Sequence, residues 1–158
     1  MTPDRIVPEN VPIHASCVSI GGAAVLLLGP SGAGKSDLAL RLIDRGAMLV
    51  ADDQVQLSTT QGQLLARPPA NISGMIEVRN LGIFHMEHEA NVPVKLAITL
   101  DDAAPRYPLD RQTMAFCGIP VPHARINSHT QSAPIKVEMA LKRAIAARQS
   151  ISAESKIA

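Results

Sequence analysis

The sequence predicts an α/β protein with a strand-rich mixed sheet and few helices, and three observations support that prediction. Residues 29–36 satisfy the phosphate-loop pattern G-x-x-x-x-G-K-[ST]. The apolar run 25–28 precedes them as an expected strand, and residues 36–45 follow with apolar side chains at helical spacing. Elsewhere, short apolar runs between turn residues outnumber helical stretches and do not alternate with them regularly.

The composition indicates one domain, residues 1–158, long enough to bury a core. Residues 1–12 are expected to form an extended leader, and residues 150–158 a frayed tail. The net charge of +1 gives no reason to expect nucleic acid or a membrane surface as a partner. No apolar run approaches the roughly 20 residues that span a bilayer, and the first residues do not resemble a signal peptide. Because the two cysteines lack C-x-x-C spacing, we expect reduced core residues and a cytoplasmic protein.

The phosphate loop predicts a bound nucleoside triphosphate with Mg²⁺. Its glycines let backbone N–H groups approach an oxyanion at the start of a helix. Lys35 would contact the β- and γ-phosphates, and the Ser36 hydroxyl suits Mg²⁺. The residues expected to bind the nucleotide are Gly29, Pro30, Ser31, Gly32, Ala33, Gly34, Lys35 and Ser36.

Turn residues divide the rest of the chain. Gly21-Gly22 predicts a hairpin whose second strand, 23–28, leads into the phosphate loop. The run 48–51 predicts a strand beside that one. The other expected elements are a hairpin over 55–57 and 64–66, strands over 76–84, 94–100 and 119–122, loops over 103–111 and 124–132, and a helix from about 132 with Val137, Leu141 and Ile145 as its apolar stripe.

Two pairs of aspartates end apolar runs, Asp52-Asp53 and Asp101-Asp102. A strand that ends in aspartate is the usual way to hold Mg²⁺ beside a phosphate loop. The first pair would share the sheet edge of the phosphates, with one carboxylate on metal or water and the other as general base. The alternative for either pair is an ordinary turn.

Other polar residues leave two interpretations open. Glu77 and Arg79 alternate along an expected strand, so they face one side either as site residues or as an ordinary exposed surface. His14 is either a base or orienting group, or a half-buried strand histidine. His85 and His88 are too loosely spaced from other ligands to predict a zinc site.

The order of these motifs resembles the catalytic domain of HPr kinase/phosphorylase. The shared features are His14, the phosphate loop, residues 45–53 and Glu77-Val78-Arg79-Asn80-Leu81-Gly82-Ile83. That bacterial family phosphorylates a serine of HPr, the phosphocarrier of the sugar phosphotransferase system, and can reverse the reaction. The resemblance spans about residues 14–125. It implies a P-loop kinase core of the HPr kinase and phosphoenolpyruvate-carboxykinase-like type, here in a short form with the C-terminal catalytic domain alone.

The resemblance also implies roles for individual residues, with ATP and Mg²⁺ as cofactors and a homo-hexamer as the assembly. Asp53 matches the aspartate that accepts a proton in phosphorylation and donates it in the reverse reaction. The implied catalytic residues are Asp53, His14, Lys35 and Arg111; the metal ligands are Ser36 and Glu77, with Asp52 beside them; Arg79 and Arg125 are further site residues.

Two positions depart from the family pattern. Asn80 stands where the family has glycine, which asparagine tolerates because it adopts positive φ more readily than most residues. Pro122 replaces an arginine of a segment, 119–125, that resembles the family's dephosphorylation loop. The loss of one cation at a phosphate site is expected to weaken the reverse reaction.

Three functions are consistent with the sequence. The first is an ATP-dependent serine protein kinase that acts on HPr or a paralogue, with reversal by inorganic phosphate. The second is a small-molecule kinase, whose phosphate loop would look the same. The third is a nucleotide-dependent sensor that signals by ordering its loops. The double aspartate Asp52-Asp53 and Glu77 argue against a sensor, because a protein that only binds nucleotide does not require a general base.

Overall fold

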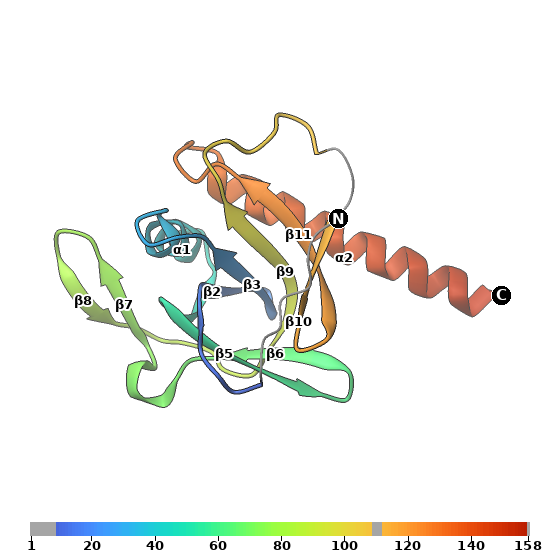
Figure 1. Cartoon of the computed structure of the whole chain (residues 1–158), viewed down its shortest axis with the longest axis horizontal. Coiled ribbons are helices and arrows are strands. Elements are labelled where there is room, and N and C mark those ends of the chain that lie inside the picture. The colour runs from blue at the N-terminus through green and yellow to red at the C-terminus, as the bar shows by residue number, and fades with distance from the viewer. Residues whose placement is uncertain (1–8, 109–111, 158) are drawn as a thin grey trace.

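The structure, a computed structural model, describes residues 9–108 and 112–157. A mixed nine-stranded sheet, a separate two-stranded hairpin and two α-helices form its described part (Figure 1). Residues 1–8 of the expected leader and Arg111 lie outside the described residues. The elements are β1 (Ile13–His14), β2 (Ser16–Ile20), β3 (Ala23–Leu28), α1 (Lys35–Asp44), β4 (Met48–Ala51), β5 (Gln54–Thr60), β6 (Gln63–Arg67), the 3₁₀ turn η1 (Ala70–Ile72), β7 (Met75–Val78), β8 (Gly82–His85), β9 (Val92–Leu100), β10 (Gln112–Phe116), β11 (Ile119–Ile126) and α2 (Ala133–Ile157).

Strand β3 lies in the middle of the sheet and carries the phosphate loop at its end. It pairs antiparallel with β2, which confirms the predicted hairpin, and parallel with β9. The prediction that 48–51 lies beside β3 is wrong, because β4 pairs with β2 instead. Two antiparallel steps still make β4 parallel to β3, so both strands end at the same edge of the sheet. The predicted position of the aspartates at the phosphate edge is therefore confirmed.

Each face of the central strands is covered by a different layer. Val25 and Leu27 of β3 face α1 and α2, whereas Leu26 and Leu28 face the β5–β6 hairpin. Both helices lie on one side of the sheet and β5–β6 lies on the other (Figure 1). Because β3 is buried on both faces, it reads as a continuous apolar run. Because β3 is packed on both faces, the position and direction of the phosphate loop that follows it are fixed relative to the sheet.

Strand β11 is longer than predicted, and β10 was not predicted. Residues 124–126, expected to be loop, continue β11 and pair with β9. Pro120 and Pro122 are tolerated because pairing with β9 starts at His123, so neither proline lies between two paired strands. Helix α2 confirms its predicted start and apolar stripe, and its helical bounds extend to Ile157.

The segment 76–84 forms a hairpin and not the single strand that was predicted. Strands β7 and β8 pair antiparallel, with Asn80 in the turn between them at φ 75°. This is the left-handed conformation for which asparagine was expected to substitute for glycine. Arg79 therefore lies in the turn and does not share a strand face with Glu77.

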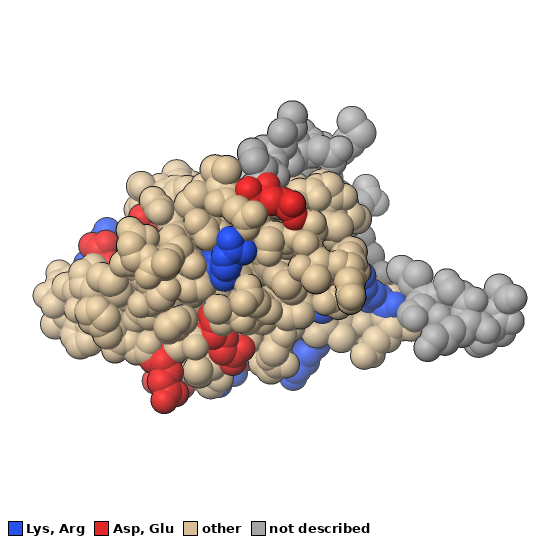
Figure 2. All heavy atoms as spheres, turned by 90° about the horizontal axis from the view of Figure 1, so that it is seen from below, with Lys and Arg blue, Asp and Glu red and all other residues tan. Residues whose placement is uncertain are grey.

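None of the described helices is both long and apolar enough to cross a bilayer. Charged side chains of both signs are scattered on the face shown in Figure 2, and neither sign forms a large patch there. Cys17 is buried and Cys117 is half-buried, and both are free thiols, as predicted.

We expect Leu26→Ala to destabilise the fold by about 2–5 kcal/mol, because the leucine is fully buried between β3 and β5–β6 and truncation leaves a cavity. Urea unfolding followed by circular dichroism measures the change. The matched control is Leu81→Ala at a leucine that is 71% exposed, which should cost less than about 0.5 kcal/mol. Equal losses in the two variants would contradict the two-layer core.

Candidate active site

The phosphate loop closes between the end of β3 and the start of α1. Gly34, immediately before α1, has φ 94°, and a Cβ there would lie 3.3 Å from Ser128 Oγ. Glycine thus meets two requirements, a left-handed backbone and a close neighbour. Ser128 is buried and donates its hydroxyl to Ala33 O at 2.8 Å, which ties the loop to the segment before α2.

The side chain of Lys35 is buried beneath the phosphate loop. Its Nζ donates to Gly29 O at 2.8 Å and to Pro30 O at 2.9 Å. Burial lowers the pKa of the Lys35 ammonium, and the nearby carboxylates of Asp53 and Asp52 partly oppose that shift. The ammonium is therefore positioned by carbonyl groups, which a phosphate oxygen would replace with a stronger, charge-assisted partner.

Asp52 is a buried carboxylate that joins three elements. Its Oδ1 accepts hydrogen bonds from Ser16 Oγ at 2.9 Å and from Ser36 Oγ at 2.6 Å. Its Oδ2 accepts the Glu77 backbone N–H at 3.0 Å. Burial of a carboxylate is costly unless its oxygens are hydrogen-bonded, and here both are. Asp52 thereby fixes the phosphate loop, β2 and the β7–β8 hairpin relative to the end of β4.

The side chain of Asp53 points away from the sheet, whereas the side chain of Asp52 is buried. Its φ is 68°, a conformation that a non-glycine residue adopts at some cost and that is frequent at functional sites. The Asp53 N–H donates to Ser16 Oγ at 3.2 Å, and its carboxylate lies 2.8 Å from His14 Nε2. Both of these side chains are exposed, at 66% for Asp53 and 45% for His14. The geometry thus presents one carboxylate to solvent beside the phosphate loop.

The structure brings together part of the predicted site. His14, Lys35, Ser36, Asp52 and Asp53 are linked to one another or to the loop by hydrogen bonds. The Glu77 backbone joins them, whereas its side chain is exposed. Among the described residues, Arg79 and Arg125 make no hydrogen bond or ion pair with this group. Arg125 lies 3.7 Å from Asp101, the nearest partner of its guanidinium.

The second acidic pair behaves as a turn, which was the alternative interpretation. Asp101 Oδ1 accepts the Ala103 N–H at 2.9 Å, an arrangement in which an aspartate side chain closes its own turn. Its other oxygen faces Arg125. Asp101 is thereby engaged in local contacts, and the acidic group beside the phosphate loop is Asp52-Asp53.

Sequence reasoning missed three residues that hold the site. Ser16 bridges the two aspartates, Ser128 holds the loop, and Arg41 donates to Ser128 O at 2.5 Å and Thr130 O at 3.2 Å. The available signal was Ser16 itself, because a serine in an apolar strand requires a hydrogen-bond partner. Nothing local in the sequence marks Ser128 or Arg41.

Two oxygen atoms of a kind suited to Mg²⁺ lie together at the start of α1. Ser36 Oγ donates a hydrogen bond to Asp52 Oδ1 at 2.6 Å, and both are hard oxygen donors of the kind that Mg²⁺ prefers. No group of three His, Cys, Asp or Glu side chains suited to a metal occurs in the described ranges. A Mg²⁺ ion here would therefore rely on few protein ligands together with phosphate and water, as is usual for nucleotide-bound magnesium.

Fold and site together define the class, a P-loop protein with a strand-rich mixed sheet. The HPr Serine kinase C-terminal domain family matches residues 6–158, so the chain belongs to that family.

Similar proteins agree with this assignment. The HPr kinase/phosphorylase of Aromatoleum aromaticum is 36% identical over 131 residues, which cover 74% of this chain and 42% of that protein. That of Clostridium beijerinckii is 46% identical over 80 residues, 51% of this chain and 26% of that protein. The chain thus spans less than half the length of these relatives. The structure of the Hpr(Ser) kinase/phosphatase from Coxiella burnetii matches with a TM-score of 0.82 and 27% identity, covering 93% of this chain and 98% of that one.

The buried imidazole of His123, on the same strand as Arg125, predicts that the folding stability depends on pH. Its Nε2 lies 2.7 Å from Thr99 Oγ1, and its Nδ1 is buried without a partner among the described residues. Burial lowers the pKa of His123 from its ordinary value, and the Arg125 charge adds to the effect. The unfolded chain therefore binds a proton more readily than the folded one, so stability falls as the pH drops below about 6.5.

We expect His123→Gln to remove this contribution. The loss of unfolding free energy between pH 7 and pH 5 should be smaller in the variant than in the original protein, as measured by urea titration at each pH. His88→Gln, at an exposed histidine outside this contact, is the control and should keep the original pH dependence. An unchanged pH dependence in His123→Gln would rule out the buried neutral imidazole.

Proposed function

We propose that the protein is an ATP-dependent serine kinase that phosphorylates HPr or a paralogous phosphocarrier in the cytoplasm. The observation that supports it most is the exposed Asp53 carboxylate, fixed beside the phosphate loop by Ser16 and adjacent to His14. A protein that only binds nucleotide does not require a general base beside the phosphate loop. Family membership supports the choice of acceptor.

The proposed binding step uses the loop and its lysine. Backbone N–H groups of residues 31–36, at the loop and the start of α1, would surround the phosphates. Lys35 would exchange its two carbonyl partners for the β- and γ-oxygens. Ser36 and Asp52, with Glu77 at the hairpin, would hold Mg²⁺, which supplies charge neutralisation on the phosphates when bound.

Asp53 would act as the general base. It accepts the proton of an incoming serine hydroxyl while the oxygen bonds to the γ-phosphorus and the bond to ADP breaks. His14, 2.8 Å away, would orient the carboxylate. In the reverse direction, inorganic phosphate attacks the phosphoserine, Asp53 returns the proton to the serine oxygen, and pyrophosphate leaves.

The reverse reaction depends on cations that hold inorganic phosphate. Pro122 stands where the family has an arginine, and Arg125 already faces Asp101 at 3.7 Å. Both facts reduce the positive charge available on β11, so we propose that the kinase direction predominates. Arg111 and Arg79 would contribute further positive charge, and a homo-hexamer is the assembly that the family suggests.

We expect Asp53→Asn to lower phosphate transfer by about 10²–10⁴-fold, because a general base contributes a factor of that size. Asparagine tolerates the left-handed φ of 68°, so the backbone and ATP binding should be retained. Labelled-phosphate transfer to the carrier and isothermal titration with ATP measure the two effects. Asp102→Asn, at the exposed neighbour of Asp101, is the charge-matched control and should transfer normally. Substantial turnover by Asp53→Asn would remove Asp53 from its role.

The acceptor is tested by incubation with labelled ATP and purified HPr or its nitrogen-branch paralogue. We expect label on one serine of the carrier, and a slower release of that phosphate as pyrophosphate when inorganic phosphate is added. Restoring arginine with Pro122→Arg should accelerate the second reaction and leave the first unchanged. Label on a sugar or nucleotide alone would indicate a small-molecule kinase, and hydrolysis without transfer would indicate a sensor.

A further inference from the structure

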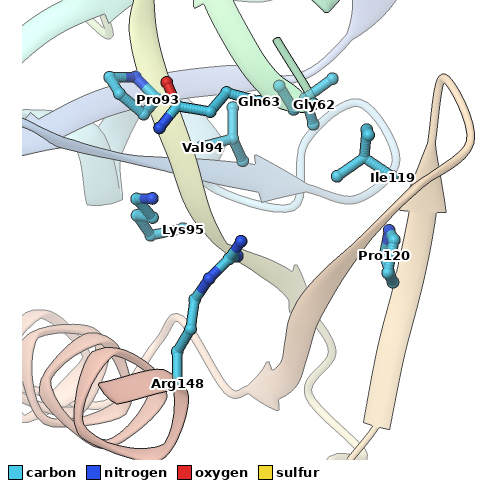
Figure 3. A pocket seen from close by; sticks show the side chains of 9 residues that line it. Gly62, Gln63, Pro93, Val94, Lys95, Ile119, Pro120 and Arg148 are labelled. Atoms are coloured by element: carbon cyan, nitrogen blue, oxygen red, sulfur yellow. The ribbon is translucent and has the colours of Figure 1, made fainter. Parts of the chain in front are cut away.

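A narrow hollow lies at the end of β9 that is remote from the phosphate loop. It is lined by Gly62, by the first residues of β6, β9 and β11, and by Arg148 of α2 (Figure 3). Its volume of about 20 Å³ holds little more than one water molecule, so only a single small group fits inside. The kinase proposed above makes no use of this hollow.

Strand pairing is interrupted at Lys95, in the wall of the hollow. Strand β3 pairs with Val94 and then with Leu96, so Lys95 is the extra residue of a β-bulge. Pairing with β6 ends at Pro93, and pairing with β11 begins at Ala97. Lys95 therefore has no partner in any of these three ladders. Bulges of this kind redirect a side chain, and here the redirected side chain is a cation that lines the hollow.

Two positive charges line the hollow, and no negative charge accompanies them. Lys95 is half-buried, Arg148 is exposed, and all the other lining residues are uncharged. Figure 3 shows the Arg148 side chain extending from α2 toward β9. Neither cation makes a hydrogen bond or an ion pair with any residue that the structure describes. Like charges that share a hollow repel each other, and an anion between them replaces this repulsion by attraction.

The two side chains favour a phosphate group over other anions. A guanidinium such as that of Arg148 donates two parallel N–H groups to two phosphate oxygens, and the Lys95 ammonium acts as a point charge. A phosphate group carries roughly 1.5 to 2 negative charges at neutral pH, which match two cations, whereas a carboxylate carries one. The exposed Gln63 amide is a further donor at the hollow. The small volume admits phosphate oxygens and leaves the rest of the ligand outside.

We propose that this hollow binds the phosphate group of a small molecule between Lys95 and Arg148. One cation belongs to the sheet and the other to α2, so the bound group ties the far part of the helix to the sheet. The packing of α2 on the core ends at Ile145, and the helix continues past the sheet (Figure 1). The proposal is independent of the kinase activity, because the phosphate loop follows the strand end that pairs with Thr99, at the other end of β9.

Nuclear magnetic resonance of the full chain, labelled with ¹⁵N and titrated with sodium phosphate, tests the site directly. The Gly62 amide reports the hollow and the Gly34 amide reports the phosphate loop, so the two sites are measured separately. We expect a saturable shift at Gly62 with a dissociation constant on the order of 1–10 mM, as two charge-assisted hydrogen bonds would give. Glycerol phosphate is the second ligand, and tighter binding than that of inorganic phosphate would assign the group to a phosphate ester.

Single substitutions identify the binding groups. Lys95→Gln and Arg148→Gln should each weaken the phosphate response at Gly62 about tenfold and leave the response of the phosphate loop unchanged. The matched controls are Lys142→Gln and Arg143→Gln, which remove the same charges from exposed positions of α2 outside the hollow. Both controls should bind phosphate as the original protein does.

Amide hydrogen exchange tests the tie to α2. Local opening of residues 145–149 would break the site, so bound phosphate should slow their exchange. At ten times the dissociation constant the slowing is about tenfold, and it should be absent from Arg148→Gln and present in Arg143→Gln.

The absence of a saturable shift at Gly62 would overturn the site, and so would equal phosphate affinity in Arg148→Gln and Arg143→Gln. Shifts confined to the phosphate loop would likewise show that the hollow binds no phosphate. Unchanged exchange of residues 145–149 would overturn the tie to the helix. None of these measurements uses ATP or an acceptor protein, so a failure of the kinase proposal leaves the result for this site unaffected.

Discussion

The buried carboxylate of Asp52 is the constraint on which the site depends. Two serine hydroxyls and one backbone N–H satisfy its oxygens, and they come from β2, from the first turn of α1 and from β7. A buried carboxylate without these partners would destabilise the fold by several kcal/mol, on the order expected for an unpaired buried charge. Stability and site geometry are thus coupled, because the same three bonds that allow burial also place the phosphate loop beside the end of β4.

This coupling explains why two adjacent aspartates behave differently. Asp52 points into the sheet, where its carboxylate is buried and hydrogen-bonded. Asp53 adopts a left-handed backbone that turns its carboxylate outward, next to His14. Ser16 contacts both, since its hydroxyl donates to Asp52 and accepts from the Asp53 N–H. One side chain on β2 therefore contacts both aspartates and sets the buried carboxylate of Asp52 relative to the exposed carboxylate of Asp53.

Local patterns predicted the elements, and long-range contacts decided their arrangement. The β2–β3 hairpin and the phosphate loop follow from turn glycines and apolar runs within about 25 residues. Local patterns did not predict which strand pairs with β4, because β2 and β3 are both apolar and either could pair with it. Ser128 and Arg41 meet across 87 residues, a contact that no local pattern encodes. The missed β7–β8 hairpin is different, since Asn80 and Gly82 were available as turn signals.

The central claim is that Asp53 faces the terminal phosphate of a triphosphate held over Lys35. A crystal structure with Mg²⁺ and a non-hydrolysable ATP analogue tests it most directly. The account predicts the γ-phosphorus on the β4 side of the loop, with room for one hydroxyl group between it and the Asp53 carboxylate. A γ-phosphorus directed toward Ser128, or an Asp53 carboxylate turned away from it, would contradict the account.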